Sequence, residues 1–323
     1  MKHLAVALSV ALAVSALAET ASAQTYPNRP IRMVVPYAPG GGVSVYAQLI
    51  GNKLNEILKQ PVVIENRPGV GGNIGSEAVA KSPPDGYTVL IHTAALASAG
   101  PLYKSLPFNP LKDFAPVTNV VATQLILAGS LKSTASTLPE LIAQAKANPG
   151  KLNYASSGRG STLHLFAELL KVSAGVDIVH IPYRGDAPMI TAVIAGEVQM
   201  AFLPQATGQG AVQDGRMRGL AITGTKRSPQ LPNTPTLLEA GVKGFEVGTW
   251  TGIWMPAGTP PEIVSTFQQA VAKALADPAV AERFRSFGAE PVGNTPAEFA
   301  EFFKADVERY ARIIEQAKIP KLD

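Results

Sequence analysis

Short runs of β-branched residues alternate along this chain with longer amphipathic segments, and glycine-rich loops separate the two. Residues 31–37, 62–66 and 87–91 have the apolar composition of buried strands, and a loop and a helical pattern follow the first two of them. Strand, loop, helix and strand in this order is the βαβ signature of a parallel or mixed sheet. The sequence therefore predicts an α/β fold.

The same pattern restarts in the middle of the chain. Predicted strands lie at residues 125–128, 152–156, 176–182, 198–203 and 220–223, with helical patterns among them. The C-terminal third is mostly helical and lacks the strands for a third unit. A length of 323 residues is enough for two such units. We predict that residues 24–124 and 245–323 form domain 1 and that residues 125–244 form domain 2, with a ligand cleft between them.

The N-terminal tail has the layout of a secretory signal peptide. A basic start at Met1-Lys2-His3 precedes an apolar run over residues 4–18, and the small residues Ala21-Ser22-Ala23 follow. The apolar run is shorter than a membrane-spanning helix, although a retained N-terminal anchor is the alternative. We expect cleavage near Ala23/Gln24 and a periplasmic mature protein.

The composition excludes several kinds of site. The chain has no cysteine, so disulfides, thiolate metal ligands and a cysteine nucleophile are absent. Three histidines remain after processing, His92, His164 and His180. No two of them are four residues apart, the spacing at which two histidines on one helix bind zinc. The formal net charge of +4 comes from scattered residues, which fits small anions better than nucleic acid, or is simply a solvated surface. We expect no metal, cofactor or nucleic-acid partner.

Three loops that join a strand to a helix are the candidate ligand site, at residues 37–44, 156–162 and 183–187. A helix N-terminus presents unpaired N–H groups and partial positive charge, and glycine lets an anion approach the backbone closely. The alternative is that these glycines only form tight turns. The candidate ligand-binding residues are Tyr37, Ala38, Gly41, Gly42, Val43, Ser44, Thr93, Ala94, Ser157, Gly158, Ser161, Thr162, His164, Tyr183, Gly185 and Asp186, to which Leu203 is added below.

Motifs of catalysis are missing from the sequence. The glycine runs at 69–74 and 158–163 lack the third glycine of the dinucleotide fingerprint, and there is neither a Walker A loop nor a G-x-S-x-G nucleophile elbow. Ser161 and His164 are three residues apart on a predicted helix, but a serine–histidine pair alone does not make a catalytic site. We expect His164 to pack or to form hydrogen bonds behind the cleft. The sequence predicts a binding protein and no enzyme.

A series of motifs resembles one known family over essentially the whole chain that follows the predicted signal peptide. The motifs are YPNRPIR at 26–32, VVPYAPGG at 34–41, VIENRPG at 63–69, GGNIG at 71–75, PDGYT at 84–88, PGKLNYAS at 149–156, HIPYRG at 180–185, PTL at 235–237, EAG at 239–241 and PAGTP at 256–260. In this order and spacing they resemble the periplasmic solute receptors of tripartite tricarboxylate transporters, also called Bug proteins.

The resemblance implies a two-domain periplasmic binding protein of the type II-like Venus-flytrap kind, each domain a mixed sheet flanked by helices. Such a receptor captures a small carboxylate through backbone amides and hydroxyls, partly through ordered water, and delivers it to membrane transporter subunits. It implies neither catalysis nor a cofactor, and we expect a monomer. Two rival functions remain open, a ligand-sensing subunit for a signalling partner and a secreted α/β hydrolase.

The chain departs from the family pattern at three positions. Ser44 stands where the family commonly has Asp, Gln48 where Arg is frequent, and Leu203 at a commonly acidic position. The loss of two acids disfavours recognition of an amino group. We therefore expect a plain carboxylate, for instance an aromatic one.

Overall fold

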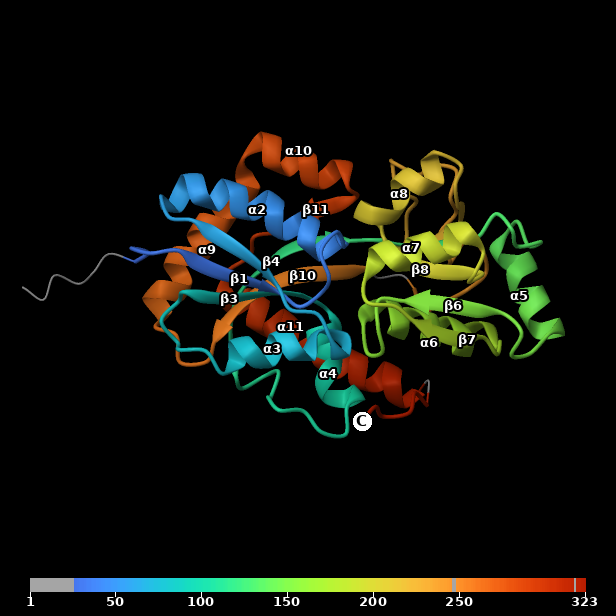
Figure 1. Ribbon diagram of the computed structural model, residues 1–323, viewed down its shortest axis with the longest axis horizontal. Helices are drawn as coiled ribbons and strands as arrows, with labels where there is room; N and C mark the ends of the chain where they lie inside the picture. The colour runs from blue at the N-terminus through green and yellow to red at the C-terminus, as the bar shows by residue number, and fades with distance from the viewer. Residues whose placement is uncertain (1–25, 246–247, 317) are drawn as a thin grey trace, which may run out of the picture.

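The computed structural model describes residues 26–245, 248–316 and 318–323. The predicted signal peptide, residues 1–23, lies outside the described residues. Two mixed sheets flanked by helices lie side by side along the longest axis of the molecule (Figure 1). The predicted α/β architecture is confirmed.

The first sheet has six strands in the described part of the chain, and their order is β11-β4-β10-β3-β1-β2. β1 runs parallel to β2 and β3, whereas β10 is antiparallel to β3 and β4, and β11 is antiparallel to β4. The strands are β1 (Ile31–Val35), β2 (Val62–Asn66), β3 (Thr88–Thr93), β4 (Phe114–Thr123), β10 (Thr249–Pro256) and β11 (Ala289–Pro291).

Both faces of this sheet are buried, which explains the continuous apolar runs in the sequence. In β1, Ile31, Met33 and Val35 pack into one core and Val34 into the core on the opposite face, as the two-residue period of a strand requires. The first face is covered by α2 (Gly42–Leu58), α9 (Pro261–Ala276) and α10 (Pro278–Ser286). The second face is covered by α3 (Asn73–Ala80), α4 (Ala95–Leu102) and α11 (Pro296–Gln316).

The second sheet has five strands among the described residues, in the order β7-β6-β8-β5-β9. β6 is parallel to β7 and β8, and β5 is antiparallel to β8 and β9. The elements are β5 (Leu125–Gly129), β6 (Asn153–Ser156), β7 (Val179–Pro182), β8 (Met200–Pro204), β9 (Arg218–Ile222), α5 (Leu138–Ala147), α6 (Thr162–Ala174), α7 (Asp186–Ala195) and α8 (Gln205–Gln213). We call the first sheet with its helices the six-stranded unit and the second sheet with its helices the five-stranded unit.

The chain passes between the units at two places that lie close together. β4 ends at Thr123 and β5 begins at Leu125, so Gln124 alone makes the first passage, and the chain returns between β9 and β10. The Gln124 side-chain amide donates to the carbonyl oxygens of Thr223 (2.6 Å) and Lys226 (2.8 Å), which ties the two passages together. β4, α4 and α8 have no counterpart in the sequence prediction.

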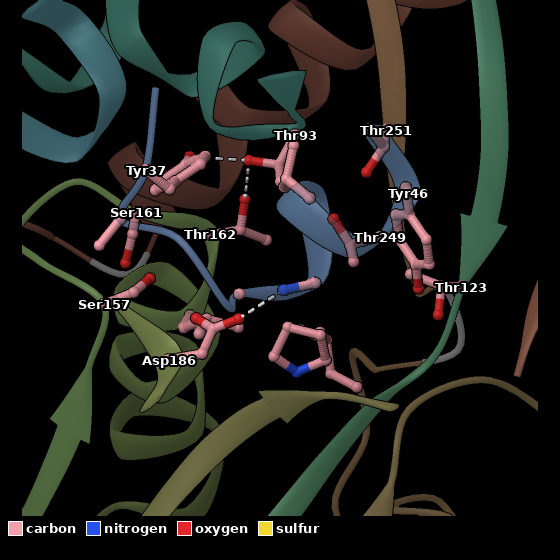
Figure 2. Close-up of a pocket in the computed structure, with 17 residues that line it drawn as sticks. Tyr37, Tyr46, Thr93, Thr123, Ser157, Ser161, Thr162, Asp186, Thr249 and Thr251 are labelled. Atoms are coloured by element: carbon pink, nitrogen blue, oxygen red, sulfur yellow. Dashed lines mark hydrogen bonds between the residues drawn. The ribbon is translucent and has the colours of Figure 1, made fainter. Parts of the chain in front are cut away.

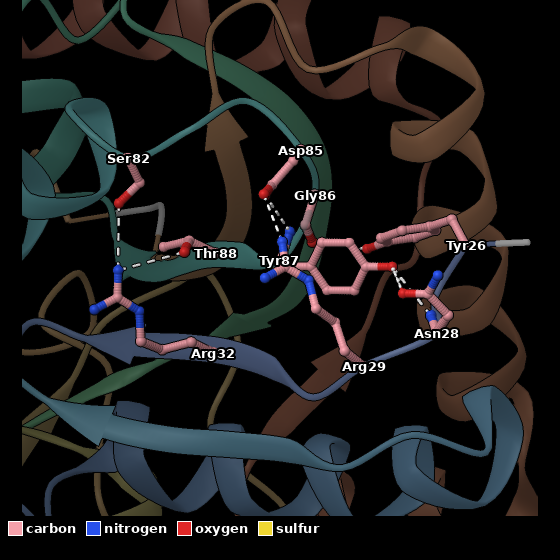
Figure 3. Close-up of polar contacts among 9 residues, drawn as sticks. All are labelled: Tyr26, Asn28, Arg29, Arg32, Ser82, Asp85, Gly86, Tyr87 and Thr88. Atoms are coloured by element: carbon pink, nitrogen blue, oxygen red, sulfur yellow. Dashed lines mark hydrogen bonds and ion pairs between the residues drawn. The ribbon is translucent and has the colours of Figure 1, made fainter. Parts of the chain in front are cut away.

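Residues 26–29 form hydrogen bonds and an ion pair with the turn that carries the PDGYT motif at 84–88 (Figure 3). The Tyr26 hydroxyl donates to the Gly86 carbonyl oxygen (2.8 Å), and Arg29 pairs with Asp85 (2.7 Å). Gly86 has a φ of +81°, in the left-handed region, and a Cβ there would collide with Ile263. This motif therefore serves the fold of the six-stranded unit. No helix among the described residues is long and apolar enough to cross a membrane.

Candidate functional site

A small cavity lies at the junction of the two units and takes its walls from both (Figure 2). It offers about 40 Å³ to the centres of water molecules, which is room for roughly three waters or one carboxylate group. Its lining residues are Tyr37, Ala38, Gly41, Gly42, Val43, Tyr46, Thr93, Thr123, Leu125, Ser157, Ser161, Thr162, Leu163, Asp186, Pro204, Thr249 and Thr251.

A chain of three hydroxyl groups crosses the cavity from one unit to the other. Tyr37 follows the end of β1, Thr93 is the last residue of β3, and Thr162 is the first residue of α6. The Tyr37 and Thr93 hydroxyls are 3.0 Å apart, and the Thr162 hydroxyl donates to that of Thr93 at 3.2 Å. Figure 2 shows the three side chains converging. These groups can turn to donate hydrogen bonds to an anion.

The N-terminus of α6 supplies backbone donors beside these hydroxyls. Ser161 is the N-cap, and its Oγ accepts the N–H of His164 at 3.3 Å. The N–H groups at the start of a helix have no acceptor within the helix. Thr162 and Leu163, the first two residues of α6, both line the cavity, so their N–H groups are placed to bind an anion.

The N-terminus of α2 meets a carboxylate of the five-stranded unit. Gly41 is the N-cap without a side-chain cap, and the N–H of Gly42 donates to Asp186 Oδ2 at 3.0 Å. Asp186 opens α7 and is only 8% exposed. A Cβ on Gly41 would lie 3.0 Å from the same oxygen, so glycine is what lets the two loops meet. Burial raises the pKa of Asp186, and the bond from Gly42 opposes this shift.

No Lys, Arg or His is among the described residues that line the cavity. Burial raises the pKa of Tyr37 far above its ordinary value and that of Tyr46 to about 12, so both phenols stay protonated at neutral pH. Thr249 is 7% exposed, and its hydroxyl has no hydrogen-bond partner among the described residues. The groups that the described lining residues offer to a ligand are therefore neutral hydroxyls and helix N-termini, without a cationic side chain.

A wider cavity of about 590 Å³ adjoins the small one, with which it shares Tyr37, Ala38 and Ser157. We call it the outer cavity. Its walls include the exposed Arg159 and Arg184 of the five-stranded unit. The two units also touch here, because the Tyr103 hydroxyl donates to the Arg159 carbonyl oxygen at 3.1 Å. A ligand longer than one carboxylate can extend into this space.

The structure brings together ten of the residues proposed from the sequence. Those in the small cavity are Tyr37, Ala38, Gly41, Gly42, Val43, Thr93, Ser157, Ser161, Thr162 and Asp186. Gly158, Tyr183 and Gly185 line the outer cavity instead.

Four proposed residues line neither of these cavities. Ser44 is buried within α2 and accepts a hydrogen bond from the Asn66 side-chain amide at 3.1 Å. Ala94 is fully buried at the start of α4. Leu203 packs in the core of the five-stranded unit, where it would contact a Cβ on Gly208 at 2.9 Å.

The fourth, His164, lies behind the α6 N-terminus. Its Nδ1 accepts the N–H of Gly160 at 3.3 Å, and its ring is 4.3 Å from that of His180. Burial lowers the pKa of His164 to about 4, so the ring is neutral at physiological pH. The expected role of His164 in hydrogen bonding behind the cleft matches this geometry.

Seven residues of the small cavity escaped the sequence prediction: Tyr46, Thr123, Leu125, Leu163, Pro204, Thr249 and Thr251. Thr249 and Thr251 alternate with Trp250 along β10, and Trp250 packs in the core 5.8 Å from Trp254. Both tryptophans pack in the same core on one face of the strand, and the two-residue alternation places the two threonines on the other face. The described residues contain no cluster of His, Asp or Glu that could hold a metal ion.

Two mixed α/β units with a ligand-sized cavity between them define the class of periplasmic binding proteins, and solved structures support this class. The periplasmic binding protein BugD superposes with a TM-score of 0.88 at 34% identity, over 92% of this chain and 100% of that one. A protein of R. palustris solved with adipate has a TM-score of 0.88 at 35% identity, with the same coverage of both chains. MatC from Rhodopseudomonas palustris, solved with bound malate, has a TM-score of 0.86 at 31% identity, over 90% and 100% of the chains.

Sequence comparison identifies the family. Residues 46–319 match the tripartite tricarboxylate transporter family receptor. Protein BugT of Bordetella pertussis is 36% identical over 318 residues, which are 98% of each chain. A protein encoded between tcbD and tcbE in Pseudomonas sp. (strain P51) is 38% identical over 91% of this chain and 88% of the other. The chain belongs to this family of periplasmic solute-binding receptors, and the predicted class of a binding protein in place of an enzyme is confirmed.

Proposed function

We propose that this receptor captures a small carboxylate in the cavity between its two units and delivers it to the membrane subunits of a tripartite tricarboxylate-type transporter. One observation carries the proposal. The hydroxyls of Tyr37, Thr93 and Thr162 converge with the N-terminus of α6 on a space of carboxylate size. Two neighbours in structure were solved with adipate and malate, both of which are carboxylates.

The hydrogen-bond donors come from both units, so a bound ligand can stabilise the closed arrangement of the receptor. Tyr37 and Thr93 belong to the six-stranded unit and Thr162 to the five-stranded unit. A ligand that touches both units stabilises the closed arrangement, because it binds that arrangement more tightly than an open one. We propose that residues 24–124 with 245–323, and residues 125–244, move as two domains about the passages at Gln124 and before β10.

The ligand's first carboxylate fills the small cavity, and the rest of the molecule extends into the outer cavity. The small cavity offers about 40 Å³ to the centres of water molecules, which suits one carboxylate group. The outer cavity shares three lining residues with it and carries two arginines at its wall. A positive rim attracts anions from solution and raises their association rate.

A thermal-shift screen tests the binding claim. The mature protein is heated with adipate, malate, citrate, benzoate or amino acids, each in large excess. A ligand at a hundredfold excess over its Kd stabilises the native state by about 2.7 kcal/mol, which is a readable shift. A shift with at least one carboxylate supports the proposal, whereas no shift with any of them contradicts it.

Two further steps complete the proposed role. Export with cleavage near Ala23/Gln24 predicts that the intact mass of the exported protein corresponds to a start at or near Gln24. Delivery predicts that uptake of the bound carboxylate by cells is lost when the gene for this receptor is deleted, and returns with the wild-type gene. Normal uptake in the deletion strain would contradict the transport role.

A further inference from the structure

The small cavity contains an acid at the place where an anion is proposed to bind. Asp186 is the one acidic residue among its described lining residues, and no basic residue lines it. Its Oδ2 accepts the Gly42 N–H at 3.0 Å. The amide at the start of α2 that would otherwise serve a ligand is therefore already in use. A carboxylate that enters this space meets a second carboxylate in a site without a cation.

The described residues that line the cavity around Asp186 carry no positive charge that would balance two anions. The other titratable groups that line the cavity are the phenols of Tyr37 and Tyr46, which stay neutral. The helix of Asp186, α7, has no other ionisable residue, and neither does the glycine loop at residues 38–42 that packs against it. Arg159 and Arg184 lie in the outer cavity. Among the residues that the structure describes, the N-terminus of α7 and the Gly42 N–H are the partners that favour the charged form.

We propose that Asp186 couples carboxylate binding to proton uptake, so that an anionic carboxylate and one proton from solvent enter the site together. The inference rests on the proposed function. The proton goes to Asp186 Oδ1, while Oδ2 continues to accept the Gly42 N–H. The resulting O–H then donates to the ligand carboxylate. The site thus changes from one anion without ligand to one anion with ligand, and the proton turns a repulsive neighbour into a hydrogen-bond donor.

Burial supports this direction, because it raises the pKa of Asp186 even without ligand. A second anion nearby raises the pKa of a carboxyl group further. Between the pKa values of Asp186 in the free and in the bound receptor, the affinity for an anion falls by up to tenfold for each unit by which the pH rises.

The test measures proton uptake directly. Calorimetric titration of the mature receptor with adipate, or with malate where adipate gives no thermal shift, is run at one pH in phosphate and in Tris buffer. The two buffers release different heats when they give up a proton, so the difference gives the number of protons bound. At a pH between the pKa values of Asp186 in the free and in the bound receptor, we expect about one proton to be taken up per ligand molecule. We also expect the affinity to weaken as the pH rises from about 6 to 8.

The variant Asp186→Asn keeps an acceptor for Gly42 and carries no charge. We expect it to bind the same probe with no proton uptake, with little pH dependence and about tenfold or more tightly than the wild type at about pH 8. The control Asp214→Asn removes an exposed acid after α8 and should behave as wild type. A circular dichroism spectrum and a melting curve show whether either variant folds.

Three results would overturn the inference. The first is binding of adipate or malate by the wild type without proton uptake across this pH range, which needs no variant. The second is a folded Asp186→Asn receptor with weaker binding at high pH. The third is an amino acid that binds more tightly than either probe without proton uptake, since Asp186 would then accept from an ammonium group. No binding of any carboxylate would instead refute the proposed function itself.

Discussion

Thr162→Val removes one hydroxyl from the cavity and keeps the shape of the side chain. The Thr162 hydroxyl donates to Thr93 across the junction at 3.2 Å, and the residue is 4% exposed. A neutral hydrogen bond contributes about 0.5–1.5 kcal/mol to stability, so the loss should lower the free energy of unfolding by about 1 kcal/mol. A bond to a charged acceptor contributes about 1.5–3 kcal/mol, so carboxylate affinity should fall by roughly ten- to a hundredfold.

Calorimetric titration with the carboxylate that binds the wild type measures the affinity, and urea unfolding measures the stability. Thr191→Val on the exposed face of α7 is the matched control, because its hydroxyl bonds to the Ala187 carbonyl oxygen away from the cavity. We expect wild-type affinity in the control. An unchanged affinity in Thr162→Val, with binding intact, would show that the hydroxyl chain does not touch the ligand.

Three other predictions follow from the site and its surroundings. Gly41→Leu should abolish carboxylate binding, because its Cβ would lie 3.0 Å from Asp186 Oδ2 and the side chain would fill the cavity; calorimetry that still shows binding would contradict this. The double variant Arg159→Gln/Arg184→Gln should lower the association rate by about tenfold at low salt and leave the dissociation rate unchanged in stopped-flow measurements. Burial lowers the pKa of His92 from 6.5 to about 3, so stability is lost as the pH falls below 6.5; His92→Gln should remove about 2 kcal/mol of the loss seen in urea unfolding between pH 7 and pH 5.

Local patterns explain why so much of the fold could be predicted. Strands such as β2 and helices with their caps depend on neighbours in the sequence, and Asp277 does accept the N–H groups of Ala279 and Val280 as the N-cap of α10. At α9, by contrast, Pro260 stands at the N-cap position, and the hydroxyl of the preceding Thr259 donates to the Pro256 carbonyl oxygen and does not cap the helix. A polar residue before a proline thus caps the helix at α10 but not at α9, where its side chain bonds to another backbone group.

The candidate site was harder to predict, because it depends on contacts between distant segments. The glycine loops and Thr162 are visible as strand-to-helix junctions, whereas Thr249 reaches the cavity only because β10 pairs with β3 and β4. The sequence also places Asp186 in a loop without showing that it meets Gly42, 144 residues away. Asp186 was a candidate ligand-binding residue because it lies in a strand-to-helix loop, but the argument from the lost acids at Ser44 and Leu203 did not show that this carboxylate meets the start of α2, which depends on long-range packing.

A crystal structure of the receptor with its best-binding carboxylate tests the central claim most directly. The account predicts the units closed on the ligand, with carboxylate oxygens within about 3.2 Å of the Thr93 and Thr162 hydroxyls and of the first N–H groups of α6. The rest of the ligand should lie toward Arg159 and Arg184. A carboxylate bound elsewhere, with the hydroxyl chain untouched, would contradict the account.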